Sequence, residues 1–206
     1  MMLGYNKNNL IKGVMMIENK PSISFKTLLT KEEYDRLVLK FNTGSFDYQT
    51  NYYFDTDRFS LKAKNASLRI RKRDDLEVIL KVPNKYRTEI YNEKITEEHF
   101  KEILKKEIVD LENITRPLVA IIGDQKIHNF ISLATKRLIV KYQNGILFID
   151  ENKYFDKVDF DLEYITKSNF YEGRTEFVNV INECHISYQK TDKKIKRAFN
   201  ALRATI

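Results

Sequence analysis

The 206-residue sequence contains one cysteine, three prolines and six glycines. Because Cys184 has no possible partner in the chain, an intramolecular disulfide is excluded, and a reducing compartment is expected, so we predict a cytoplasmic protein. The few prolines and glycines, with hydrophobic residues at 42%, argue against extended disorder. A chain of this length is most simply one domain with a sizeable core.

Long apolar runs are also missing. No run approaches the roughly 18 residues that span a bilayer, so we expect no membrane partner. The longest apolar stretch among the first 20 residues covers positions 14–17, whereas a secretory signal needs about 7–15 apolar residues. We predict that residues 1–20 form a disordered extension, with Met15 and Met16 as alternative start sites, and that residues 21–206 form the folded domain.

The motifs of several enzyme classes are absent. The sequence has no G-x-x-x-x-G-K-[ST], G-x-G-x-x-G or G-x-S-x-G, which excludes P-loop, dinucleotide-binding and serine-hydrolase sites of the usual kind. His99, His128 and His185 lack the spacing of metal ligands, and we interpret them as ordinary surface or core residues. Cys184 is interpreted as a small buried hydrophobe rather than a nucleophile.

Positive charge is in excess. The net charge is +7, and the isoelectric point of about 9.2 implies attraction to nucleic acid, an acidic membrane or a small phosphate-rich substrate. Aromatic residues are frequent, with 12 tyrosines and 13 phenylalanines, and they favour strands.

The pattern of alternating residues predicts an α+β domain built on an antiparallel sheet. We expect eight strands, at residues 22–29, 50–54, 66–73, 77–82, 89–94, 133–143, 146–151 and 159–166. Five helices are expected, one capped by Thr30 with Glu33, one capped by Thr96, a short one after Pro117, and two near residues 174–184 and 191–203. Turns are predicted at residues 74–75 and 144–145.

Charged residues alternate with aliphatic ones in four of these strands. In residues 68–71, Arg69 and Arg71 share one strand face and the aliphatic residues share the other. The cations of this pattern are Arg69, Arg71, Lys81, Arg137 and Lys141, and the carboxylates are Asp161 and Glu163, with Asp150 in the neighbouring hairpin.

Two interpretations of this pattern stay open. In the first interpretation, each strand shows a solvated face, as strands do in most antiparallel sheets. In a closed or strongly curved sheet, however, the cations would hold phosphate while the carboxylates hold a divalent ion. The same choice applies to the basic residues near the end of the chain, which offer either phosphate contacts or a solvated helix face: Lys190, Lys193, Lys194, Lys196 and Arg197.

A set of short motifs occurs in a characteristic order. They are residues 22–26 (SISFK), 51–56 (NYYFDT), 67–71 (SLRIR), 79–81 (ILK), 134–137 (ATKR), 147–150 (LFID), 161–164 (DLEY) and 193–198 (KKIKRA). With these motifs the chain resembles the CYTH superfamily of triphosphate tunnel metalloenzymes, and within it the small bacterial CYTH proteins. The resemblance extends from about residue 22 to residue 202.

The resemblance implies an eight-stranded antiparallel β-barrel, a tunnel with polar residues inside and helices packed outside. By resemblance, the phosphates of a triphosphate would be held by Lys26, Arg69, Arg71, Lys81, Arg137 and Lys194. Asp150, Asp161 and Glu163 would belong to a metal-facing wall for Mg²⁺ or Mn²⁺. Members of the family hydrolyse inorganic triphosphate, thiamine triphosphate or nucleoside triphosphates, and some make cyclic AMP.

One departure from the family bears on activity. The family's Glu-x-Glu-x-Lys motif reads Ser22-Ile23-Ser24-Phe25-Lys26 here, and serine hydroxyls are poor Mg²⁺ ligands. Two hypotheses therefore stand together: a metal-dependent triphosphatase with weakened or lost activity, and a non-catalytic module that binds triphosphate, polyphosphate or a nucleotide. Nucleic-acid binding is disfavoured because the aromatic residues mostly lie opposite the cations.

The sequence does not assign a role to the acidic strand at residues 89–94. Glu89 and Glu93 share one face of this strand and Asn92 lies on the other, so the position that matches the family's carboxylate is left open.

Overall fold

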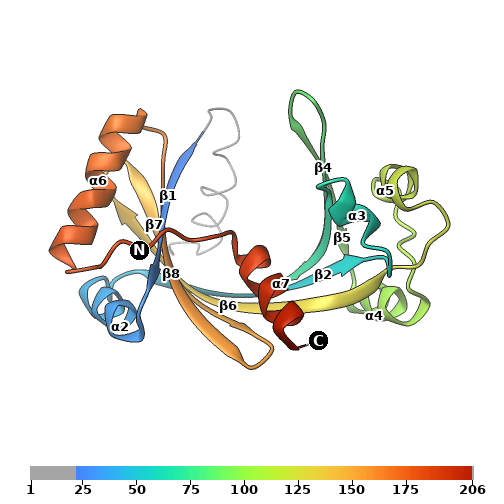
Figure 1. The fold of residues 1–206 in the computed structure, drawn as a ribbon, viewed down its shortest axis with the longest axis horizontal. Coiled ribbons are helices and arrows are strands. Elements are labelled where there is room, and N and C mark those ends of the chain that lie inside the picture. Colours follow the sequence, from blue (N-terminus) through green and yellow to red (C-terminus); the bar gives the residue numbers. More distant parts are fainter. Residues whose placement is uncertain (1–21, 206) are drawn as a thin grey trace, which may run out of the picture. The chain divides into compact units, whose positions relative to one another are not determined.

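The computed structural model describes residues 22–205, so the extension predicted at residues 1–20 lies outside the described residues (Figure 1). The strands are β1 (Ile23–Leu29), β2 (Ser45–Asp55), β3 (Ser67–Lys72), β4 (Leu76–Pro83), β5 (Thr88–Ile95), β6 (His128–Tyr142), β7 (Gly145–Tyr154) and β8 (Lys157–Thr166). The helices are α2 (Lys31–Lys40), α3 (Ser60–Ala63), α4 (Glu97–Lys106), α5 (Thr115–Ile122), α6 (Phe170–Glu183) and α7 (Lys194–Thr205). The α+β prediction is confirmed.

The eight strands form one antiparallel sheet in the order β1-β8-β7-β6-β2-β3-β4-β5. This confirms the predicted number of strands and their antiparallel arrangement. The strands β1 and β5 stand at the two edges of this order, and the described residues do not pair them. The sheet is therefore not closed by strand pairing, and the barrel implied by the family resemblance goes beyond what this order supports.

The described residues divide into two compact units. Unit 1 contains residues 22–46, 137–150 and 160–191, and unit 2 contains residues 47–136, 151–159 and 192–205. Each unit has its own apolar core.

In unit 1, α2 and α6 pack on one face of the strands β1, β7 and β8 (Figure 1). Thr30 caps α2, because its hydroxyl accepts from the Glu33 amide while the Glu33 carboxylate accepts from the Thr30 amide. Asn169 caps α6, because its side-chain oxygen accepts from the Tyr171 and Glu172 amides. The core of this unit includes Leu37 of α2, Val180 of α6, and the strand residues Leu138, Leu147, Ile149, Leu162 and Tyr164.

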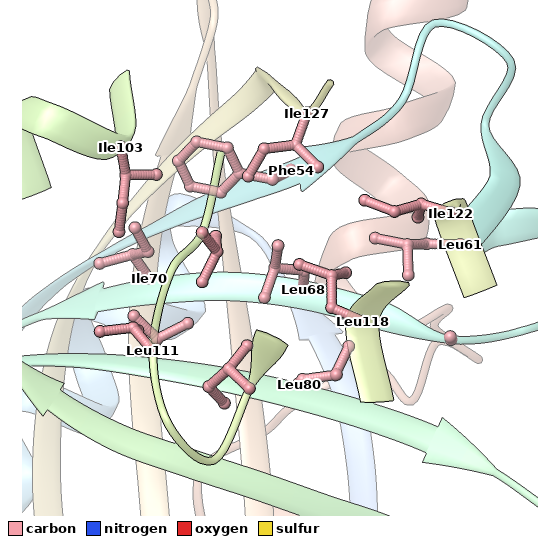
Figure 2. Packing of buried hydrophobic residues seen from close by; sticks show 14 of the residues in the cluster. Phe54, Leu61, Leu68, Ile70, Leu80, Ile103, Leu111, Leu118, Ile122 and Ile127 are labelled. Atoms are coloured by element: carbon pink, nitrogen blue, oxygen red, sulfur yellow. The ribbon is translucent and has the colours of Figure 1, made fainter. Parts of the chain in front are cut away.

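In unit 2, the helices α3, α4 and α5 pack against β2, β3 and β4. Figure 2 shows Leu68, Ile70 and Leu80 from the strands meeting Ile103 of α4 and Leu118 of α5. Leu68, Ile70 and Leu80 are at most 1% exposed. Full burial of such a side chain contributes about 1.5–3 kcal/mol, which fixes the direction of the alternate, charged residues.

A smaller apolar cluster in unit 2 anchors the last helix. Ala198 and Ala201 of α7 pack with Ile131 and Leu133 of β6 and with Tyr154 of β7. The small alanine side chains let the helix approach the strands closely. The first turn of α7, which carries Lys194, is held near these strands as a result.

Several boundaries differ from the prediction. Helix α3 was not expected, and α6 begins four residues earlier than predicted because Asn169 caps it. Helix α7 begins at Lys194, three residues later than expected, and β2 begins at Ser45. His128 is the first residue of β6, and its imidazole contacts Glu107. No helix within residues 22–205 has the length and apolar character needed to cross a membrane.

Candidate phosphate-binding site

In unit 2, charged side chains occupy the strand faces that point away from the core. Arg69 and Arg71 alternate with the buried Leu68 and Ile70 of β3. In the antiparallel register, Ser67 pairs with Lys81 and Arg71 pairs with Glu77, so these side chains share a face of the β3–β4 pair. The predicted alternation is therefore present in these two strands.

The cations on this face are close enough to affect one another. Burial lowers the pKa of the Lys81 ammonium, and the positive charges of Arg69, Arg71 and Lys193 lower it further. The Nε of Arg69 is buried and has no hydrogen-bond partner among the described residues. A lysine destabilised by neighbouring cations, beside an unsatisfied guanidinium nitrogen, is the arrangement that an anion would stabilise.

Arg71 differs from Arg69 because its charge is balanced within the protein. Its guanidinium forms an ion pair with Glu77, and the other carboxylate oxygen of Glu77 accepts from the Asn92 amide at 2.7 Å. Asn92 thus lies on the charged face. Arg71 has fewer unused donors for a ligand than Arg69 has.

The two glutamates of β5 are on the core face of the strand and have structural partners. Glu89 accepts from the Tyr91 hydroxyl at 2.7 Å, and Glu93 accepts from the Asn113 amide at 2.9 Å. Their register opposite Val82 and Val78 places them away from the cations. In β5 the charged face therefore carries Asn92 rather than either glutamate.

Lys194 of α7 is held by a buried polar network in unit 2. Its ammonium donates to Oδ1 of Asn152 at 3.0 Å, and the Thr135 hydroxyl donates to the same oxygen at 2.9 Å. The Asn152 amide donates to Asp159 at 3.0 Å. The family resemblance assigns Lys194 to the phosphate-binding residues, and in this structure its ammonium already has a protein acceptor in Asn152.

Asp159 connects this network to Arg197 in the first turn of α7. The guanidinium of Arg197 donates to both oxygens of Asp159, at 2.8 and 2.9 Å, and the Tyr154 hydroxyl donates to it as well. Burial alone would raise the pKa of Asp159, but these hydrogen bonds lower it. Burial and the hydrogen bond to Asp159 raise the pKa of Tyr154 to about 12, so Tyr154 remains a donor at neutral pH.

In unit 1, the main charged contact is a buried pair. Arg137 donates to both oxygens of Asp150, at 2.8 and 2.7 Å, and Asp150 is fully buried. The guanidinium also lies 4.1 Å from the centre of the Phe148 ring. Burial disfavours the charge of Arg137, but Asp150, with Glu163 and Asp161, raises its pKa above the ordinary value.

The remaining charged residues of unit 1 share this strand face. Lys26 of β1 is opposite Glu163 of β8, and their side chains form an ion pair at 2.9 Å. Asp161 is 2% exposed and alternates with core residues of β8. Lys141 is exposed on β6, four residues beyond Arg137, and forms no ion pair with any residue from 22 to 205.

The carboxylates of unit 1 do not form a ready metal site. Within residues 22–205, no group of three or more histidine, cysteine, aspartate or glutamate side chains is placed to hold a metal ion. Both oxygens of Asp150 are bound to Arg137, and Glu163 is paired with Lys26. Ser24, in place of a family carboxylate, lies opposite Ile165. The residues present therefore do not fit a preformed Mg²⁺ or Mn²⁺ site.

The predicted residues fall into two sets. Unit 2 contains Arg69, Arg71, Lys81 and Lys194, and unit 1 contains Lys26, Arg137, Lys141, Asp150, Asp161 and Glu163. The sequence analysis did not single out Glu77, Asn152 or Asp159. The hairpin turn at residues 74–75 places Glu77 opposite Arg71. The pairing of Glu77 with Arg71 could therefore have been predicted from the sequence by counting residues on either side of the turn.

Comparison with known proteins identifies the relatives of this chain. The family model of the CYTH domain matches residues 20–199. The "Putative triphosphatase YjbK" of Bacillus subtilis (strain 168) is 31% identical over 195 residues, which cover 89% of this chain and 97% of that protein.

Solved structures share the fold. A structure from Bacillus halodurans, described as "a putative adenylate cyclase", has a TM-score of 0.73 and 27% identity, and the match covers 87% of this chain and 98% of that one. The "Putative adenylyl cyclase HpAC1" from Hippeastrum, described with a dominant triphosphatase activity, has a TM-score of 0.68 and 19% identity. That match covers 90% of this chain and 96% of the Hippeastrum chain.

Proposed function

Because the chain belongs to the CYTH domain family, we propose that it binds a triphosphate-bearing anion and that any hydrolytic activity is weakened or lost. The observation that carries the proposal is the cation cluster of unit 2. There, the lowered pKa of Lys81 and the unpartnered Nε of Arg69 both favour an added anion. Phosphate oxygens accept several charge-assisted hydrogen bonds, and arginine forks match their geometry.

In this proposal, cations on the charged strand faces bind the phosphates. Arg69 and Lys81 bind phosphate oxygens directly, and Arg71 contributes less because Glu77 holds it. Lys26, Arg137 and Lys141 supply further positive charge, and Lys194 does so from α7. Inorganic triphosphate, a nucleoside triphosphate and thiamine triphosphate all carry the phosphate groups that these residues would recognise.

We expect weak hydrolysis because some candidate metal-binding carboxylates are replaced by serine and another is bound to an arginine. A triphosphatase of this family would use a divalent ion to neutralise the phosphates, but Ser22 and Ser24 replace two candidate ligands. Asp150 would have to leave Arg137 before it could bind a metal ion. What the remaining residues can do without that ion is hold and orient the phosphates.

A non-catalytic binding module is the second candidate. The serines in the first strand and the engaged Asp150 favour it, whereas the likeness to a protein named as a triphosphatase favours residual catalysis. In either case we propose a cytoplasmic location, in keeping with the single buried Cys184.

Phosphate release and calorimetry together test the proposal. Inorganic triphosphate, ATP and thiamine triphosphate should be assayed with and without Mg²⁺ or Mn²⁺, and binding should be measured in parallel. We expect binding of at least one of them, with slow or no phosphate release. Arg174→Ala, an exposed arginine on α6, is the control for charge loss and should leave binding unchanged. Absence of binding by all three anions would reject the proposal, and brisk metal-dependent release would reject the claim of weakened activity.

A further inference from the structure

A cleft at one end of the unit 1 strands shares only Lys141 with the site described so far. It has a volume of about 350 Å³ and is lined by residues 141, 143–146 and 165–167, from the β6–β7 turn and the end of β8. We infer that this cleft holds the nucleoside part of a nucleoside triphosphate. The inference rests on the proposed function and names the class of triphosphate that the site prefers.

The cleft continues the charged strand face of unit 1. Lys141 is four residues beyond Arg137 on β6, and Ile165 is two residues beyond Glu163 on β8. At about 3.3 Å per residue, these separations are roughly 13 Å and 7 Å along the strands. A ligand whose phosphates lie near Arg137 and Lys26 would therefore extend its organic group towards the cleft.

The surface of the cleft suits a base and a sugar better than a phosphate. Ile146 and Ile165 are half-buried and supply apolar contact area. Ile165 pairs with Ser24, whose small side chain leaves space beside it. The amides of Gln143 and Asn144 are at the same end, and amide groups can both donate to and accept from a base edge. An apolar wall with a few polar groups is typical of sites for organic ligands.

The charges around the cleft discriminate between organic triphosphates. Lys141 and Lys167 line it, and neither forms an ion pair with any residue that the structure describes. The lining contains no carboxylate. The nearby Glu176 already accepts from the Tyr164 hydroxyl and the Asn144 amide, at 2.6 and 2.7 Å. Thiamine carries a permanent positive charge, so two lysines oppose it, whereas the common nucleobases are neutral at pH 7.

Competition calorimetry with ATP, inorganic triphosphate and thiamine triphosphate tests the inference. The natural protein should bind ATP about tenfold more tightly than inorganic triphosphate, because only ATP covers the two isoleucines. Ile165→Ser should remove most of this preference while leaving the affinity for inorganic triphosphate unchanged. Val158→Ser, at a 51% exposed position of the same strand but outside the cleft, is the matched control and should leave the ratio unchanged.

Two further variants test the apolar contacts and the charge of the cleft separately. Ile146→Ser should reproduce the effect of Ile165→Ser, and retained binding of inorganic triphosphate shows that either variant is folded. Lys167→Glu should shift the preference from ATP towards thiamine triphosphate by several-fold, because it replaces a repelling charge with an attracting one.

The outcomes separate this inference from the proposed function. If none of the three anions binds the natural protein, the proposed function fails and the inference fails with it. If inorganic triphosphate binds as tightly as ATP, or if Ile165→Ser weakens both equally, the nucleoside site is rejected while triphosphate binding stands. Tighter binding of thiamine triphosphate than of ATP by the natural protein would also overturn the inference.

Discussion

At the residue scale, two arginines on one strand have different environments. Arg71 is paired with Glu77, whereas the Nε of Arg69 has no partner among the described residues. Arg69→Ala should therefore weaken triphosphate binding by about 1.5–3 kcal/mol, the usual contribution of a hydrogen bond to a charged group. Arg71→Ala should cost less, because Glu77 already competes for its donors. Calorimetry on both variants decides this, and a larger loss in Arg71→Ala would contradict the assignment.

Lys81 should make binding depend on pH. Burial and the neighbouring cations lower its pKa in the free protein, and a bound polyanion would raise it again. At a pH near the lowered value, binding should therefore take up protons, and affinity should fall as the pH rises through that value. Titrations at several pH values below 10.5, the ordinary pKa of a lysine, in two buffers of different ionisation enthalpy measure the uptake. Lys81→Met is the control, and an equal proton uptake in this variant would remove Lys81 as the cause.

The two ion pairs of unit 1 should differ in their contribution to stability. Asp150→Asn breaks a fully buried pair and leaves Arg137 without its counter-charge, so we expect a loss of about 3–5 kcal/mol in the free energy of unfolding. Glu163→Gln removes the partner of the 40% exposed Lys26, and about 1 kcal/mol or less should be lost. Urea unfolding of both variants measures the two losses in the free energy of unfolding. Similar losses in both variants would show that the buried pair is not the stronger structural contact.

At the element scale, strand β1 determines how the missing carboxylates can be restored. Ser24 shares the face of Lys26, and Lys26 is opposite Glu163. Ser22→Glu with Ser24→Glu would add two carboxylates to the strand face that carries Lys26, the nearer of them two residues from the Lys26–Glu163 pair, so affinity for Mn²⁺ and metal-dependent triphosphate hydrolysis should both rise. Calorimetry with Mn²⁺ and phosphate release measure the change. The double variant Ser22→Gln with Ser24→Gln controls for size, and an equal gain in it would contradict the role of charge.

The elements that the sequence predicted well have local causes. Thr30 and Thr96 cap their helices as expected, because a capping hydroxyl acts within a few residues of the chain. The strand face on which Arg69 lies was predicted correctly, because side chains in β3 alternate between the two faces with a period of two. Helix α3 was missed because it has only four residues, and its amides at Leu61 and Lys62 depend on the Asp55 carboxylate of the preceding strand.

At the scale of the whole molecule, the sequence could not reveal which charges neutralise each other. Alternation assigned Arg137 and Asp150 to one charged face, but their bidentate contact depends on how β6 and β7 are paired. The same holds for Asn152 and Asp159, whose network includes residues of α7, about 40 positions away in the chain. A free cation and a paired one look alike in a sequence, and this distinction separates anion binding from structural support.

The stoichiometry of binding tests whether Lys26 and Arg69 act on one ligand. If they do, one triphosphate should bind per chain, and Lys26→Ala and Arg69→Ala should each weaken that one binding event. Both variants should also reduce the protection of the natural protein against thermal unfolding, which amounts to about 2.7 kcal/mol at a ligand concentration 100 times the dissociation constant. Lys64→Ala, an exposed lysine after α3, is the control for lost charge. Two binding events per chain, with each variant abolishing a different one, would show instead that Lys26 and Arg69 belong to separate sites, and the proposal of one shared triphosphate site would have to be abandoned.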